Sequence, residues 1–113
     1  MNRPSVALVA RANRSRRQLA TYLRAGGYDV LECRDLATAR SVAGVVVIDS
    51  AGARERARAW LRLASSLRIV VISSKPSGWK TLAMAHRDDV YVLAAPAFGW
   101  QIVDALRAPA TLA

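Results

Sequence analysis

Residues 45–52 read VVVIDSAG, in which four apolar β-branched residues lead directly to Asp49 and then to three small residues. Such a run is typical of a strand that is buried on both faces of a parallel sheet. The small residues indicate a turn at the carboxyl end of the strand, which is where open α/β sheets usually hold ligands and chemistry. The stretch therefore predicts an α/β fold that displays the Asp49 carboxylate at this edge of its sheet.

Strand and helix patterns alternate on both sides of this run. Strands are predicted over Ser5 to Ala10, Tyr28 to Cys33, Gly44 to Asp49, Arg68 to Ser73 and Val90 to Ala94. Helices are predicted over Ser15 to Ala25, Leu36 to Ser41, Arg54 to Ser65, Ser77 to His86 and Gly99 to Arg107. The second helix is unusually short, and apolar residues recur at spacings of three and four in the longer ones. Five βα units predict a three-layer, doubly wound, five-stranded parallel sheet.

The length and composition limit the class of protein. At 113 residues, 53% of them hydrophobic, the chain has room for one domain, residues 1–113, with a core from about residue 5 to residue 107. No apolar stretch approaches the ~20 residues of a membrane span, and the N-terminus does not read as a signal peptide. We therefore expect a cytoplasmic protein without a membrane span. The lone Cys33 cannot form an internal disulfide, and we expect a small buried side chain there.

The net charge of +9 comes mainly from arginine, which supplies fifteen of the seventeen basic residues. Four of these arginines straddle the start of the first predicted helix: Arg11, Arg14, Arg16 and Arg17. The helix macrodipole disfavours cations there, so an anion from a ligand or from nucleic acid would offset the repulsion. A solvated basic face is the other interpretation. Nucleic acid is the less favoured partner, because the sequence carries no recognition motif for it.

Two nucleotide-binding motifs can be tested at the first strand-to-helix turn. A dinucleotide site needs Gly-x-Gly-x-x-Gly there, and a P-loop needs a Gly-Lys-Ser/Thr ending. Residues 10–14 read ARANR and contain no glycine. The sequence therefore disfavours both kinds of nucleotide site.

The chain resembles the receiver domains of bacterial response regulators, which are CheY-like proteins of two-component signal transduction. The resemblance covers about Ser5 to Arg107 and rests on four segments in the right order: residues 6–17, 24–30 (RAGGYDV), 45–50 and 69–96. It implies a flavodoxin-like sheet with strand order 2-1-3-4-5. Receivers present an acidic pair after the first strand, a phospho-accepting aspartate after the third, a Ser or Thr after the fourth and a Lys-Pro after the fifth. The corresponding residues here are Ala10 and Arg11, then Asp49, then Ser73, then Ala95 and Pro96.

The departures at three of these positions predict a degenerate receiver, or pseudo-receiver. Mg²⁺ prefers several hard oxygen ligands, whereas this pocket offers Asp49 beside the cationic Arg11. An arginine is a poor geometric substitute for a metal ion plus the lysine that Ala95 replaces. We therefore expect no catalytic residue, no metal ion and no cofactor. Arg11 has two interpretations: a permanent ion pair with Asp49 that replaces the metal, or a side chain extended into solvent.

Recognition of a protein partner is the role that such a receiver would retain. Receivers often use the face built from the fourth helix, fifth strand and fifth helix, and a homodimer through this face is one form of that contact. Trp100 lies about 200° around its helix from the inward Ile102, so it is a candidate anchor. The alternative is that it folds against Phe98 or the chain terminus. Candidate neighbours of Trp100 are Tyr91, Lys80 and Arg107.

Other aromatic residues carry different expectations. Trp60 and Trp79 fall on the apolar stripes of their helices, so we expect them in the core. The aromatic switch position of receivers falls on Val92, and the neighbouring Tyr91 should face the other way on the strand, so a tyrosine switch is doubtful. His86 has no partner at metal-ligand spacing.

These observations favour a non-enzymatic, phosphorylation-independent signalling adaptor that binds a protein. Two alternatives stay open: a basic domain that binds nucleic acid or another anion, and a response regulator that is phosphorylated on Asp49 at an unusual metal site.

Overall fold

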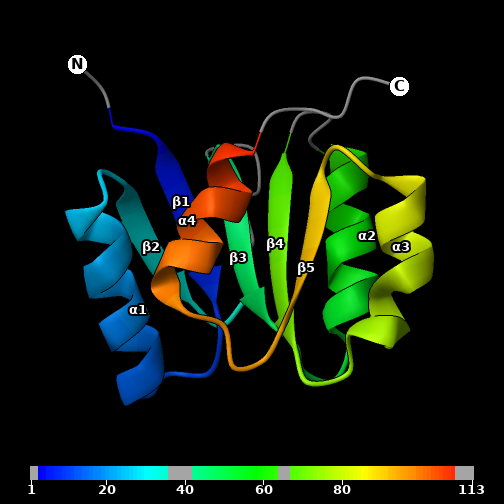
Figure 1. The fold of residues 1–113 in the computed structure, drawn as a ribbon, viewed down its shortest axis with the longest axis horizontal. Helices are drawn as coiled ribbons and strands as arrows, with labels where there is room; N and C mark the ends of the chain where they lie inside the picture. The colour runs from blue at the N-terminus through cyan, green and yellow to red at the C-terminus, as the bar shows by residue number, and fades with distance from the viewer. Residues whose placement is uncertain (1–2, 36–41, 64–66, 109–113) are drawn as a thin grey trace.

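The computed structural model describes residues 3–35, 42–63 and 67–108. Five parallel strands form one sheet in the order β2-β1-β3-β4-β5 (Figure 1). The strands are β1 (Ser5–Val9), β2 (Asp29–Cys33), β3 (Gly44–Ile48), β4 (Arg68–Ser73) and β5 (Val90–Ala94). The helices are α1 (Arg14–Ala25), α2 (Ala53–Leu63), the 3₁₀ helix η2 (Pro76–Trp79), α3 (Lys80–Ala85) and α4 (Gly99–Arg107). The predicted fold class and strand order are confirmed.

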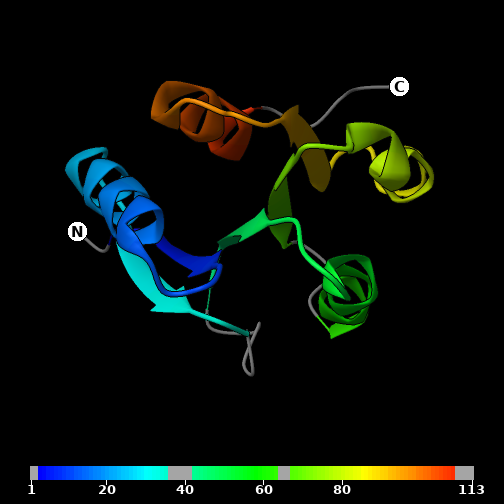
Figure 2. The same cartoon turned by 90° about the horizontal axis from the view of Figure 1, so that it is seen from below.

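The helices cover both faces of the sheet, and each face has its own apolar core (Figure 2). Alternate residues of β3 point to opposite faces, with Val45 and Val47 on one side and Val46 on the other. The first core packs against α2, η2 and α3, and the second packs against α1 and α4. Trp60 and Trp79 are buried in the first core, at 3% and 1% exposure, as predicted.

The described elements follow the predicted bounds closely, with one change of type. The predicted helix from Ser77 begins one residue earlier as the 3₁₀ helix η2, with Pro76 in its first positions, and α3 then occupies only Lys80–Ala85. Proline lacks the N–H that an α-helix interior needs, and glycine, here Gly78, disfavours a regular α-helix. The short helix expected over Leu36 to Ser41 and the last two residues of the helix expected to end at Ser65 lie outside the described residues.

Three local features define the ends of α1 and the contact between α1 and α4. Asn13 caps α1, because its side-chain oxygen accepts a hydrogen bond from the Arg16 N–H at 2.8 Å. Gly27 follows α1 with φ of 103°, in the left-handed region that glycine adopts without strain at the end of a helix. Gly99 begins α4 so close to the Tyr22 ring that a Cβ atom there would lie 2.6 Å from Tyr22 Cδ1. α1 and α4 therefore lie side by side on one face of the sheet.

The parallel register places the ends of all five strands along the same edge. Val9 pairs with Cys33 on one side and with Val47 on the other, and Ser73 pairs with Ala94. Residues just after β1, β2, β3 and β5 therefore meet at the carboxyl edge of the sheet. Among residues 3–35, 42–63 and 67–108, no helix has the length and apolar character that a membrane crossing needs.

Candidate functional site

A pocket of about 800 Å³ opens at this carboxyl edge, over the ends of β1 and β3. These two strands are where the strand order reverses, which is the usual ligand site of a doubly wound sheet. The pocket is lined by Leu8, Val9, Ala10, Arg11, Asn13, Ser15, Arg16, Leu19, Arg34, Ile48, Asp49, Ser50, Arg56, Ile72, Pro96 and Ala97. Asp49 is the only acidic residue among the lining residues, and four of them are arginines.

Asp49 and Ser73 are in direct contact. The Ser73 hydroxyl donates a hydrogen bond to Asp49 Oδ2 at 2.7 Å and accepts one from the Lys75 N–H at 3.0 Å. Ser73 is only 1% exposed, and it is the one buried polar residue among the described residues. A backbone hydrogen bond also joins Asp49 to β4, because the Asp49 N–H donates to the Ile72 carbonyl at 2.9 Å. Asp49 is thus held against the end of β4, at the position that the sequence predicted.

The remaining receiver positions offer no further carboxylate. Arg11 is exposed and lines the pocket, but no ion pair joins it to Asp49 in the described part of the chain. Ala95 donates its N–H to the Ser73 carbonyl at 2.8 Å and is joined to Pro96 by a cis peptide bond. The residues present do not fit a magnesium site, because Asp49 is the only carboxylate in the pocket and its neighbours include Arg11. No group of three or more His, Cys, Asp or Glu side chains comes together within the described ranges.

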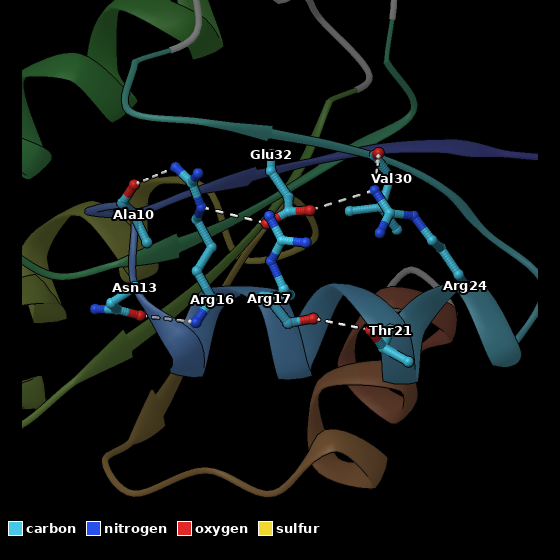
Figure 3. Close-up of polar contacts among 8 residues, drawn as sticks. All are labelled: Ala10, Asn13, Arg16, Arg17, Thr21, Arg24, Val30 and Glu32. Atoms are coloured by element: carbon cyan, nitrogen blue, oxygen red, sulfur yellow. Dashed lines mark hydrogen bonds and ion pairs between the residues drawn. The ribbon is translucent and has the colours of Figure 1, made fainter.

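Arg16 is the most strongly held arginine of the pocket (Figure 3). Its Nη1 donates to the Ala10 carbonyl at 3.0 Å, and its Nε lies 3.4 Å from Glu32 Oε1. Arg24 holds the other oxygen of the same carboxylate, with its Nη2 3.4 Å from Glu32 Oε2 and 3.1 Å from the Val30 carbonyl. Figure 3 shows both arginines reaching from α1 toward Glu32 on β2. This cluster attaches α1 to the edge of the sheet.

The structure divides the four arginines that the sequence grouped together. Arg11 and Arg16 line the pocket, whereas Arg14 and Arg17 are exposed and do not line it.

Two pocket arginines, Arg34 after β2 and Arg56 in α2, were not predicted. Arg56 Nη2 donates to Ser50 Oγ at 3.3 Å, and its Nε lies 3.9 Å from Asp35 Oδ1. The sequence carried a signal for each residue's place near the pocket. Arg34 directly follows a predicted strand, and Arg56 lies in the predicted helix that follows Asp49.

Cys33 is half-buried at the end of β2 rather than fully buried as expected. Burial raises the pKa of its thiol, the neighbouring Arg16 opposes this increase, and Asp35 adds to it. The thiol therefore stays protonated near neutral pH and is a weak nucleophile.

Two of the four residues predicted for the partner interface, Tyr91 and Trp100, lie together in the structure. Tyr91 and Trp100 line a shallow groove of about 500 Å³, here called the Trp100 groove, together with Val92, Leu93, Gln101, Asp104, Ala105 and Ala108. Trp100 is 58% exposed and Phe98 64% exposed, so Trp100 does not lie in the core. Tyr91 packs on the α1 and α4 side of the sheet and Val92 on the opposite side, as the alternation predicted.

The other two predicted neighbours of Trp100 lie elsewhere. Arg107 faces the end of α1, where its Nη2 donates to the Gly26 carbonyl at 2.9 Å and its Nε to Tyr28 Oη at 3.3 Å. Lys80 begins α3, whose buried residues belong to the core on the opposite face from α4. The Trp100 groove therefore contains neither cation, and Asp104 is its only charged residue.

Comparisons with known proteins identify the fold. A receiver domain protein from Clostridium thermocellum matches with a TM-score of 0.73 and 11% identity, over 91% of this chain and 90% of that chain. A CheY-like response regulator from Mesorhizobium loti matches with a TM-score of 0.65 and 19% identity, over 93% and 97%. A Burkholderia pseudomallei response regulator with a phosphorylated aspartic acid, calcium ion and citrate matches with a TM-score of 0.73 and 20% identity, over 93% and 67%. No family model matches the chain, and no curated protein matches it. The chain has the fold of response-regulator receiver domains, as its sequence predicted.

Proposed function

We propose that this chain is a pseudo-receiver: a non-enzymatic signalling module that acts by binding a protein and does not depend on phosphorylation of Asp49. One observation carries the proposal. At the edge where receivers place their acidic pair, this pocket has Ala10 and Arg11, and Asp49 is its only carboxylate. A single carboxylate beside a cation is a poor binding site for a divalent ion.

The geometry around Ser73 supports the same proposal. The Ser73 hydroxyl donates its one proton to Asp49 and accepts from the Lys75 N–H, so its donor is already used in this structure. Phosphoryl transfer also needs positive charge held where negative charge develops. Ala95 stands at the lysine position of receivers and supplies none. At 20% identity, the comparison with the Burkholderia pseudomallei protein supports a shared fold only. Its phosphorylated aspartic acid and calcium ion are therefore not assigned to this chain.

The Trp100 groove supports a protein partner. Tryptophan and tyrosine are enriched among residues that dominate interface energies, and this groove combines Trp100 with Tyr91 along the edge strand β5. Phe98 adds exposed apolar surface just before α4. Asp104 is the one charged side chain among its described lining residues, and the Arg68 guanidinium lies 4.8 Å from the centre of the Tyr91 ring.

The proposal is tested by the intact mass of the protein after incubation with Mg²⁺ and acetyl phosphate. We expect no added phosphoryl group, because the pocket lacks the carboxylates and the lysine that the reaction needs. A receiver domain known to accept acetyl phosphate serves as the positive control, and the Asp49→Asn variant shows whether any adduct is on Asp49. An adduct that requires both Asp49 and Mg²⁺ would show a working phosphoacceptor and would overturn the proposal.

A further inference from the structure

We infer that the carboxyl-edge pocket binds, without covalent chemistry, a small organic anion that carries two or more phosphate or carboxylate groups. This inference rests on the proposed function, since it names a ligand that would regulate the same site in place of phosphorylation. It is carried by the charge, the unused hydrogen-bond donors and the shape of the pocket.

The charge of the pocket is strongly positive. Arg11, Arg16, Arg34 and Arg56 line it, and Asp49 is the only acidic residue that does. Glu32 and Asp35 offset part of the charge of Arg16 and Arg56, and a bound anion would reduce the repulsion that the remaining positive charge produces. These arginines come from four places in the sequence: after β1, in α1, after β2 and in α2. Arg11 and Arg16 thus come from the basic group at the start of α1, and the fold adds Arg34 and Arg56 to them.

Two of the four arginines have no protein partner. Within the described residues, Arg11 and Arg34 make no hydrogen bond or ion pair, and both are exposed. Guanidinium groups match phosphate and carboxylate oxygens in bidentate geometry. Arg11 and Arg34 are thus available to clamp a ligand without breaking any contact that holds the fold.

The other two arginines are only partly satisfied. The Nε atoms of Arg16 and Arg56 are buried and have no hydrogen-bond acceptor in the described part of the chain, although carboxylate oxygens lie 3.4 Å and 3.9 Å away. Buried donors are seldom left in this condition. Each of these two arginines is thus held near a carboxylate by charge, with one N–H left without an acceptor in the described part of the chain.

The shape of the pocket favours an organic molecule over a bare inorganic ion. Its volume of about 800 Å³ lies in the range of small-molecule sites. Its apolar lining comes from Leu8, Val9, Leu19, Ile48, Ile72 and Ala97. Leu8, Val9 and Ile72 are buried beneath the pocket, and a carbon skeleton would cover the more exposed Leu19, Ile48 and Ala97 while its charged groups meet the arginines. Arg11 and Arg34 belong to different loops, and a ligand with two anionic groups can engage both at once.

The inference is tested by calorimetric titration of the purified protein with fructose 1,6-bisphosphate and, separately, with tricarballylate. The two probes distinguish a phosphate from a carboxylate ligand. The test variant is Arg11→Gln/Arg34→Gln, and the matched control is Arg14→Gln/Arg17→Gln, which removes the same charge from exposed positions outside the pocket. We expect saturable binding of at least one probe, weakened about tenfold or more in the test variant and about twofold or less in the control.

A third variant is expected to strengthen probe binding, whereas the arginine variants weaken it. Asp49→Asn removes the only negative charge of the pocket, so it should strengthen binding of the same probe severalfold. Equal weakening by the two arginine pairs would show unspecific attraction to a basic surface and would overturn the inference. Absence of saturable binding at millimolar probe would overturn it as well. Binding of a single-stranded oligonucleotide that depends on Arg14 and Arg17 would instead favour a nucleic-acid surface.

This result is separable from the phosphorylation test. A phosphoryl adduct on Asp49 would refute the proposed function whatever the titrations give. Absence of probe binding with no adduct would leave the pseudo-receiver intact and refute only the ligand.

Discussion

At the scale of single residues, the positions of Asp49 and Ser73 at the carboxyl ends of their strands are the features of the pocket that the sequence predicted best. Both positions could be assigned because each directly follows or ends a run of β-branched residues, and parallel strands bring such ends together. The partner of the Asp49 carboxylate was not predictable. Side-chain direction decides between Arg11 and Ser73, and the structure has Ser73 donating at 2.7 Å while Arg11 makes no ion pair with Asp49 among the described residues.

Ser73→Ala tests this contact. The change removes the donor to Asp49 and leaves the Lys75 N–H without its acceptor at a site that is 1% exposed. We expect a loss of about 1–3 kcal/mol in the free energy of unfolding, measured by urea denaturation. Asp49→Asn should cost less, because the amide oxygen still accepts from Ser73. Equal stability of Ser73→Ala and the parent protein would show that the contact contributes nothing.

At the scale of elements, the bounds of β4, β5 and α4 agree with prediction, but the residue that anchors α4 was missed. Arg68 begins β4, and its Nη1 donates to the Ala105, Leu106 and Ala108 carbonyls at the end of α4. Its Nη2 donates to the Asp88 carbonyl at 3.2 Å, and its guanidinium lies 4.8 Å from the centre of the Tyr91 ring. Periodicity identifies α4 because apolar spacing is local. It cannot identify a cap that comes from a residue 37 or more positions away.

Arg68→Met is expected to loosen the carboxyl end of α4. Methionine keeps the apolar stem but loses the charged donors that satisfy the last carbonyls of the helix and complement its dipole. We expect a loss of about 1–3 kcal/mol in the free energy of unfolding and faster amide hydrogen exchange in α4. Arg87→Met is the matched control, since Arg87 is exposed and makes no hydrogen bond or ion pair in the described ranges. Equal losses in the two variants would indicate an effect of net charge alone.

At the scale of the whole molecule, the surface charge shows where sequence reasoning stops. The sequence shows the net charge of +9 and the four arginines around the start of α1. Arg14 and Arg17 of that group lie outside the pocket, and Arg34 and Arg56 line it instead. This difference depends on which side of α1 faces the sheet and on how β2 and α2 meet the same edge. Arg107 illustrates the same limit, since it turns toward Tyr28 at the end of α1 and away from the Trp100 groove.

Self-association through the Trp100 groove is the prediction that belongs to this scale. Trp100 is 58% exposed beside the edge strand β5, and large apolar side chains in this position are typical anchors of interfaces. In sedimentation equilibrium we expect the average mass to rise from 12.2 kDa toward twice that value with concentration. Trp100→Ala should weaken the association about tenfold or more, because loss of a buried anchor costs about 2 kcal/mol. Leu63→Ala is the control, since Leu63 is 54% exposed at the end of α2. A dimer that persists in Trp100→Ala would show that the interface lies on another face. A mass of 12.2 kDa at every concentration would show that the protein does not self-associate, so a partner that binds the groove would have to be a different protein.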